Sequence, residues 1–337
     1  MVLTSRERVI RTLRFEGVDR PARDYWLLPA AFFGREKALQ EILNQYPRDF
    51  GDSGYRNPVD ESPLYYPGEW TDPWGSGWVN IQAGMIGEVK HPAIDDWRKL
   101  DHWKPPYHLL GKGFERVNET CAHSDKFIYL GTPRPFERLQ FVRGPENAYM
   151  DLAWGVSQAL KLLEMIHDYY MRHLEYVVHT DVDAIFFMDD WGSSNSLLIS
   201  PEMWIAYFKP LYRDYCELAH SHGKFALMHS DGYILPLYEH LIEIGVDAIN
   251  SQLFTMPIEE IGHRFKGRIT FWGELDRQHI LPFGTPQDVQ AAVERIKNAL
   301  WDDRGGVIAQ AEFNKGYPLE NIRAFFEAWW GPPDDVT

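Results

Sequence analysis

The chain has 337 residues, 45% hydrophobic and 25% charged, as in an ordinary globular protein. No apolar run approaches the roughly 18 residues of a membrane-spanning helix, and the N-terminus MVLTSRERVIRTL lacks a signal-peptide core, so we expect a cytoplasmic protein. The net charge of −15 argues against nucleic acids and anionic membranes as partners, because both require a basic surface. Cys121 and Cys216 are too few for a disulfide framework.

The first predicted helix covers residues 5 to 15, where capping-box spacing precedes an apolar stripe. A short strand at 24 to 28 and a helix at about 35 to 45 follow. Residues 46–110 are rich in Gly, Pro, Trp and Tyr, and structureless loops of that length are uncommon in compact domains. We therefore expect a lid or wall over an active site. An insertion that only buries its own aromatic residues is an equal alternative.

Strands and helices alternate regularly from residue 126 onward. Strands are predicted at 127–131, 184–188, 224–230, 247–251, 268–274 and 306–311. Helices are predicted at about 145–155, 157–176, 201–222, 234–244, from about 257, at 286–300 and at 319–329. This alternation indicates an α/β protein with a parallel sheet, and about eight strands favour closure into a barrel. The predicted fold is a single (β/α)8 TIM barrel over 1–337, with an aromatic-rich insertion near the N-terminus.

In such a barrel, the active site is formed by the loops after the C-terminal strand ends. Side chains alternate along a strand, and the set that faces the helices must be apolar. In the last predicted strand, Val307, Ala309 and Ala311 form one face. Gln310 and Glu312 form the other, so we expect both to point into the pore.

The same alternation places polar residues of other strands near the opening. His229 and Asp231 share one face, and Trp272 lies on the same side of its strand as Glu274. The adjacent pair 189–190 consists of two aspartates, of which only one can face inward; the apolar residues before them leave the choice open. One histidine and up to four carboxylates are therefore expected at the mouth.

This set of side chains has two chemical interpretations. Imidazole and carboxylate are acceptable zinc ligands, and a catalytic site needs three of them with an open position. Alternatively, they are general acid–base groups, because crowded carboxylates push one another's pKa values apart. Both interpretations compete with a structural one, in which some of the carboxylates only form ion pairs with Arg134, Arg277 or Lys315.

Three long stretches resemble the uroporphyrinogen decarboxylase superfamily, especially its corrinoid-dependent methyltransferases. They are the region from DDWGSSNSLLISPEMW through HSDGYILPLYEH to DAINSQ, the earlier TDPWGSGWVNIQAG and the later FWGELDRQHILPFGTPQDV. The resemblance spans most of the chain. It implies a (β/α)8 barrel with its site at the C-terminal strand ends.

The chain departs from both branches of this superfamily. Its decarboxylases hold tetrapyrrole carboxylates with an early RQAGR-like motif, where this chain has LLPAAFFGR, which disfavours that reaction. The methyltransferases typically bind zinc through His-x-Cys and a later Cys. The corresponding positions imply His229, Asp231 and Glu312 as metal ligands here. These donors are harder than thiolates, which favours Lewis-acid polarisation of an oxygen or nitrogen substituent.

The leading hypothesis is a methyltransferase-like enzyme that moves a methyl group from a small O- or N-methylated substrate to a corrinoid. A separate protein would carry the corrinoid, because the chain has no DxHxxG-type cobalamin motif. Candidate catalytic residues are His229, Asp231, Glu274 and Asp190, and candidate substrate contacts are Trp191, Trp272, Gln252, Gln310 and Asp189. A decarboxylase or other lyase acting on a carboxylic acid, and a barrel that binds a ligand without turnover, are the alternatives. A homodimer is one hypothesis for the assembly.

Overall fold

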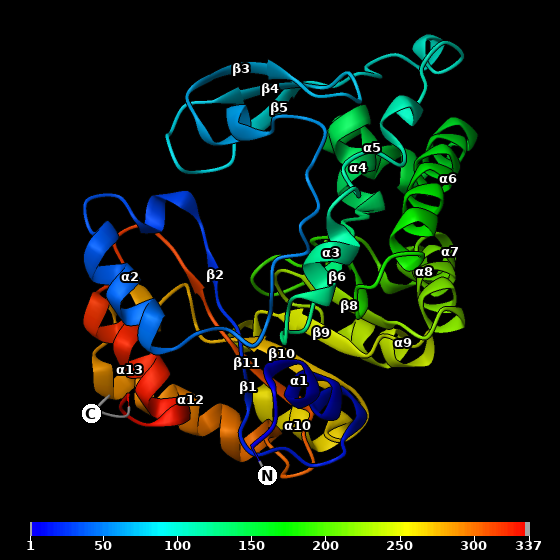
Figure 1. Ribbon diagram of the computed structural model, residues 1–337. Helices are drawn as coiled ribbons and strands as arrows, with labels where there is room; N and C mark the ends of the chain where they lie inside the picture. Colours follow the sequence, from blue (N-terminus) through cyan, green and yellow to red (C-terminus); the bar gives the residue numbers. More distant parts are fainter. Residues whose placement is uncertain (1, 334–337) are drawn as a thin grey trace.

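The computed structural model describes residues 2–333, and its centre is a seven-stranded parallel sheet in the order β1-β11-β10-β9-β8-β7-β6. The strands are β1 (Ala22–Arg23), β6 (Tyr129–Leu130), β7 (Ala184–Met188), β8 (Phe225–Ser230), β9 (Ala248–Ser251), β10 (Thr270–Glu274) and β11 (Val307–Gln310). β2 (Trp26–Leu27) and β12 (Glu312–Phe313) extend two of them as a separate parallel pair. The sheet curls, with helices around it (Figure 1).

Residues 49–51 close the sheet into a ring. The amide of Asp49 donates to the carbonyl of Arg23 at 2.8 Å, and the amide of Gly51 donates to the carbonyl of Phe127 at 2.9 Å. Phe50 and Phe127 form a parallel bridge. The segment therefore occupies the place of a strand between β1 and β6, and the predicted (β/α)8 barrel is confirmed.

The helices are α1 (Ser5–Arg14), α2 (Glu36–Gln45), α3 (Val117–Ala122), α4 (Pro135–Arg143), α5 (Pro145–Ala153), α6 (Ser157–Val178), α7 (Pro201–Tyr207), α8 (Lys209–Ser221), α9 (Tyr238–Glu243), α10 (Ile258–Phe265), α11 (Ile280–Phe283), α12 (Pro286–Leu300) and α13 (Leu319–Trp330). The helix predicted at 201–222 is two helices, because Pro210 lacks the amide hydrogen that would continue it. α3, α4 and α11 were not predicted. In the part of the chain that the structure describes, every helix is too short or too polar to cross a membrane.

α1 covers the N-terminal end of the barrel, where the carbonyl of Thr12 accepts a hydrogen bond from Gly306 at the start of β11. Buried apolar side chains fill the barrel above it, among them Phe50, Phe186, Leu227 and Trp272. A second, larger core lies between the sheet and the helices. Because Leu227 and Trp272 point inward, the residues two further along β8 and β10 also face the interior, at the C-terminal end.

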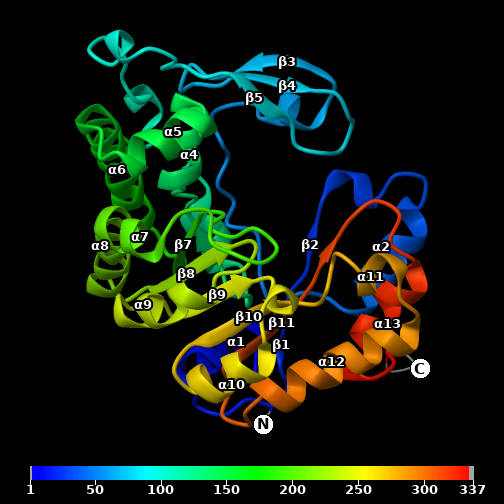
Figure 2. The same cartoon turned by 180° about the vertical axis from the view of Figure 1, so that it is seen from behind.

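The region 46–110 contains the closing segment and a small antiparallel sheet of β3 (Gly68–Thr71), β4 (Gly77–Asn80) and β5 (Glu88–His91). This sheet lies on the side of the molecule opposite α1 (Figure 2). Trp74 packs on Tyr169 of α6 with ring centroids 4.8 Å apart. On another side of the barrel, Gly84 packs closely against Ala30. A Cβ atom added at Gly84 would lie only 2.8 Å from the Cβ atom of Ala30. The insertion thus contacts elements on two sides of the barrel, and its role as a lid stays a prediction.

Candidate functional site

Three side chains meet at the C-terminal ends of β7 and β8. Nε2 of His229 lies 3.6 Å from Oδ1 of Asp190 and 3.5 Å from Oδ1 of Asp231. One ligand atom from each residue lies within 4.8 Å of the other two. These residues, which we call the mouth cluster, come from two adjacent strands and are within reach of a single ion.

The orientation of His229 is fixed by a chain of hydrogen bonds. Its Nδ1 is 2.6 Å from Oδ1 of Asn250, and Nδ2 of Asn250 donates to the carbonyl of Trp272 at 2.7 Å. Because Oδ1 of Asn250 can only accept a hydrogen bond, Nδ1 of His229 is the donor and Nε2 is left facing the carboxylates. Trp26 lies 5.1 Å away between ring centroids and helps to bury the imidazole, which is 5% exposed.

The mouth cluster fits a divalent cation. Zinc ligands lie about 2.0–2.2 Å from the metal, so neighbouring donors of a tetrahedral site are about 3.4 Å apart. The two distances from Nε2 of His229, 3.5 and 3.6 Å, are close to that spacing. The bond from Nδ1 to Asn250 is the outer contact that orients a metal-binding histidine. Two carboxylates and one imidazole are hard to intermediate donors, which suit zinc and similar divalent ions.

Without a metal, the mouth cluster holds a proton. Burial, the largest single effect, lowers the pKa of His229, but Asp190, Asp231 and Glu274 together raise it to about 10. Burial raises the pKa of Asp190, but its contacts with His229 and with the amide of Asp231 outweigh this and lower it. Near neutral pH, an imidazolium therefore stabilises the two carboxylates where a cation would otherwise bind.

Arg277 binds the other carboxylates of the mouth. Its Nη1 lies 2.8 Å from Oε1 of Glu312, and its Nε lies 3.3 Å from Oε2 of Glu274. Its Nη2 contacts Asp231, and the hydroxyl of Tyr317 donates to its backbone carbonyl at 2.7 Å. One guanidinium therefore compensates three carboxylates and holds Asp231 beside the imidazole.

The structure brings together two members of the predicted metal set, His229 and Asp231. The third, Glu312, pairs with Arg277 instead. Asp190, predicted as a catalytic carboxylate, stands in the place expected for the third ligand. The suggestion that some carboxylates are ion-pair partners of Arg277 therefore applies to Glu312, to Glu274 and, in part, to Asp231.

Glu274 is 1% exposed, and within residues 2–333 neither of its carboxylate oxygens accepts a hydrogen bond. Burial, the largest effect, raises its pKa and Arg277 lowers it; with the further increase from Asp231, the pKa is raised to about 8. Gln310, its neighbour on β11, is equally buried, and both polar atoms of its side chain lack hydrogen-bond partners in the described part of the chain. Both side chains are therefore polar groups buried inside the barrel without a hydrogen-bond partner among the described residues.

The remaining predicted residues have different surroundings. Asp189 is fully buried and accepts hydrogen bonds from the amides of residues 136 and 137, so it caps α4. Trp191 is 1% exposed and stacks on Phe136 with centroids 4.0 Å apart. Trp272 lies inside the barrel. Gln252 accepts a hydrogen bond from Gly232 and lines a cavity of about 190 Å³ beside the mouth cluster.

Several residues of the mouth were not chosen from the sequence. Asn250 shares a strand face with Gln252, and this alternation could have identified it. Trp26 lies on β2, which was predicted only as part of a longer strand. Arg134, whose Nη2 contacts Sδ of Met188 at 2.9 Å, and Glu137 belong to the unpredicted start of α4.

Two loops cross tightly to hold the carboxylates of the mouth cluster together. The amide of Gly192 donates to the carbonyl of Asp231 at 3.1 Å, and that of Tyr233 donates to the carbonyl of Ser193 at 2.8 Å. Gly232 has φ +79°, and a Cβ there would lie 2.1 Å from the carbonyl oxygen of Gly192. The crossing thus requires glycine at position 232.

Gly232→Ala is expected to lower the free energy of unfolding by about 3 kcal/mol and zinc affinity by more than about tenfold. The added methyl group pushes the loop of Asp231 away from the loop of Asp190. Gly17→Ala is the matched control, because Gly17 has φ +82° but no atom within 4 Å of the new Cβ among the described residues. Urea unfolding and zinc titration measure both variants. Unchanged zinc affinity in Gly232→Ala would show that the crossing does not position the cluster.

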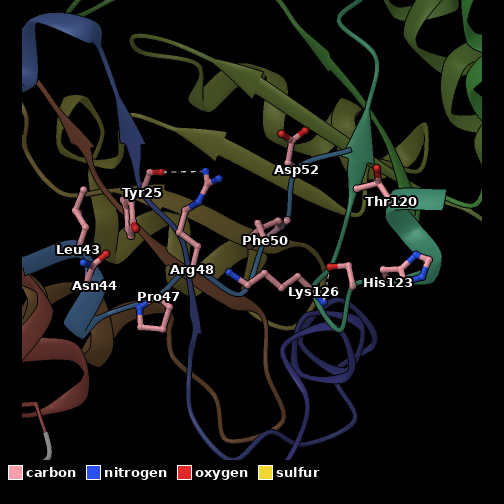
Figure 3. A pocket seen from close by; sticks show the side chains of 12 residues that line it. Tyr25, Leu43, Asn44, Pro47, Arg48, Phe50, Asp52, Thr120, His123 and Lys126 are labelled. Carbon is pink, nitrogen blue, oxygen red and sulfur yellow. Dashed lines mark hydrogen bonds between the residues drawn. The ribbon is translucent and has the colours of Figure 1, made fainter. Parts of the chain in front are cut away.

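A hollow of about 500 Å³ lies on the flank of the barrel beside the closing segment (Figure 3). The ends of α2 and α3 line it, with Phe50 between them, and the mouth cluster does not. Arg48 crosses it and donates to the carbonyl of Tyr25 at 3.4 Å. The same guanidinium lies 3.7 Å from the carboxylate of Asp24, which is buried in the barrel. We therefore place the candidate site at the mouth and not in this hollow.

Asp24→Asn is expected to stabilise the protein at alkaline but not at acidic pH. Burial raises the pKa of Asp24 from 3.8 to about 6, so stability falls as the pH rises between these values. Two pKa units correspond to about 3 kcal/mol, the upper limit of the gain. The asparagine oxygen can still accept the bond from the indole of Trp272. Urea unfolding near pH 4 and near pH 8 tests this, and an equal effect at both would contradict it.

The chain resembles known proteins in sequence and in fold. A family model described as uroporphyrinogen decarboxylase (URO-D) matches residues 79–330. A methyltransferase from Methanosarcina mazei has a similar structure, with a TM-score of 0.67 and 16% identity over 97% of this chain and 98% of that chain. A B12-independent methionine synthase from Shewanella sp. W3-18-1 reaches a TM-score of 0.41 at 12% identity, over 62% of each chain. No curated protein matches the chain.

Proposed function

Because the chain belongs to the uroporphyrinogen decarboxylase (URO-D) family, we propose that it is a methyltransferase-like enzyme built on that family's barrel. It moves a methyl group from a small O- or N-methylated substrate to a corrinoid carried by a separate protein. The observation that carries this proposal is the mouth cluster, two carboxylates and an imidazole close enough together to bind one ion at the C-terminal end of the barrel. A methyltransferase from Methanosarcina mazei has the same fold, which is consistent with this proposal.

Asp190, His229 and Asp231 would hold a divalent cation, with zinc as the first choice. Such an ion supplies Lewis acidity to the oxygen or nitrogen that carries the methyl group. The chain itself orients the ligands, since Asn250 fixes the imidazole and Arg277 holds Asp231. In the reaction, the methyl carbon exchanges its bond to the heteroatom for a bond to cobalt(I). The heteroatom keeps the electron pair of the broken bond and takes a proton from water.

The part of region 46–110 that follows the closing segment serves in this proposal as the wall that keeps bulk water from the substrate. Tyr65, at the end of η2 (Ser62–Tyr65), is close enough to the mouth to be influenced by its charges. Burial raises the pKa of its hydroxyl, as do Glu61 and Glu312, whereas Arg134 lowers it. Excluding water strengthens every electrostatic interaction in the site.

A methyl-transfer assay tests the proposed function. Zinc-loaded protein is mixed with free cob(I)alamin and a panel of methoxybenzenes and methylamines, and methylcobalamin is followed by its absorbance. We expect zinc-dependent methylation of the corrinoid by at least one class. Release of carbon dioxide from aromatic acids without any corrinoid would point to a lyase instead. Tight ligand binding with no turnover in either assay would point to a barrel that only binds.

A further inference from the structure

Gln252 carries an unused hydrogen-bond donor in the wall of the cavity beside the mouth cluster. Its side chain is 9% exposed and follows β9 directly. The amide of Gly232 donates a hydrogen bond to Oε1 of Gln252 at 3.1 Å. Because a backbone amide can only donate, this bond fixes which end of the side-chain amide is oxygen. Nε2 of Gln252 is therefore the end that is turned away from Gly232.

Nε2 of Gln252 is able to bind a ligand. No acceptor among residues 2–333 forms a hydrogen bond with it, and it is not one of the polar atoms that the described residues seal from solvent. The backbone of Gln252 is fixed as well, because its carbonyl accepts hydrogen bonds from the amide of Thr255 at 3.1 Å and from the hydroxyl of Thr255 at 2.8 Å. An acceptor on a ligand would thus meet a donor that is already oriented and lacks a protein partner.

The rest of the cavity wall is part apolar and part polar. The cavity measures about 190 Å³, several times the roughly 30 Å³ of one water molecule. Phe254 and Leu275 form apolar parts of its wall. Arg277 adds further donors, because a guanidinium has five N–H hydrogens and its carboxylate partners contact each nitrogen once. Asp276 also lines the cavity, and its carboxylate accepts hydrogen bonds from two amides of its own turn.

We propose that this cavity binds an uncharged carbonyl group of the substrate and that Gln252 selects this group. The inference rests on the proposed function and narrows it to O- or N-methylated compounds that also carry a carbonyl. A carbonyl oxygen has two lone pairs and no hydrogen, so it matches the donors of Gln252 and Arg277. An ammonium group would instead bring its own donors against Nε2 of Gln252, and a carboxylate would lie beside Asp276.

The position of the cavity connects carbonyl binding with the proposed reaction. Gly232, which donates to Gln252, follows Asp231 of the mouth cluster directly in the chain. Arg277 lines the cavity and also contacts Asp231. A small substrate held by its carbonyl in the cavity would therefore have its methylated heteroatom beside the mouth cluster, where positioning favours the reaction.

Three probes of similar size test this inference by calorimetric titration of the zinc-loaded protein. Methoxyacetophenone carries the carbonyl, ethyl-methoxybenzene has a methylene group in its place, and methoxybenzoate carries a carboxylate. We expect methoxyacetophenone to bind at least about fivefold more tightly than the other two. Gln252→Glu keeps the acceptor for Gly232 but replaces the donor by an oxygen, so the preference over ethyl-methoxybenzene should disappear. Gln278→Glu, the matched control, adds the same charge through an exposed side chain of the same cavity and should retain most of the preference.

No measurable binding of methoxyacetophenone, equal binding of ethyl-methoxybenzene, tighter binding of methoxybenzoate, or a preference that survives in Gln252→Glu would overturn the inference. Circular dichroism and thermal unfolding establish that each variant is folded, and the three probes on the unmodified protein decide the question on their own. The titrations contain no corrinoid. Failure of methyl transfer from a selectively bound ketone therefore counts against the proposed function, whereas methyl transfer without any preference for the carbonyl counts against this inference alone.

Discussion

His229→Ala is expected to lower zinc affinity at the barrel mouth by more than about 100-fold and to abolish zinc-dependent methyl transfer. Loss of an outer-shell contact alone costs about 10- to 100-fold in metal affinity, and here a ligand itself is removed. The two carboxylates of the mouth cluster would then face each other without the imidazole that separates them. Competition with a zinc chelator measures the affinity.

His222→Ala provides the control for this prediction. His222 is exposed at the end of α8 and bonds to the carbonyl of Leu218, far from the strand ends of the mouth. Its loss should leave zinc stoichiometry and affinity unchanged. A His229→Ala protein that binds one zinc ion as tightly as the unmodified protein would place the metal elsewhere.

Arg277→Met is expected to lower the free energy of unfolding by about 3–5 kcal/mol near neutral pH, because three partly or fully buried carboxylates lose their shared counter-charge. This loss in the free energy of unfolding should be smaller at acidic pH. Burial already raises the pKa of Glu274 from 4.5 to about 8, so the folded variant takes up protons more readily than the unfolded chain. Its stability therefore falls as the pH rises through this window.

Two further variants make the Arg277 prediction specific. Adding Glu274→Gln to Arg277→Met should recover part of the loss, since the most buried of the carboxylates becomes neutral. Arg268→Met removes an exposed guanidinium paired with Glu239 and should cost less than about 1 kcal/mol. Urea unfolding near pH 5 and pH 8 measures all of them. Equal losses in Arg277→Met and Arg268→Met would contradict the central role of Arg277.

The barrel could be predicted because its later strands are apolar runs that alternate regularly with helices. The closing strand could not, since residues 49–51 are only three residues in a region that otherwise has the composition of a loop. Its place in the ring depends on hydrogen bonds to Arg23 and Phe127, which are distant in sequence. The break in the helix predicted at 201–222 was visible in principle at Pro210.

The candidate site followed from strand alternation wherever one face of a strand was clearly apolar. This placed His229 and Asp231 together. It left Asp189 and Asp190 undecided, because both faces of β7 are apolar and only packing selects Asp190 for the mouth. The pairing of Glu312 with Arg277 was offered only as an alternative, since the residues lie on different strand ends and local sequence does not specify partners over that distance.

The central claim is that Asp190, His229 and Asp231 hold one divalent cation at the barrel mouth. Anomalous diffraction at the zinc absorption edge, from crystals of the protein supplied with zinc, tests it most directly. We expect one strong peak within bonding distance of Nε2 of His229 and of a carboxylate oxygen from each aspartate. An anomalous peak only at another place in the protein would contradict it. So would crystals grown with zinc in which the imidazolium of His229 bonds directly to the two aspartates and no ion lies between them.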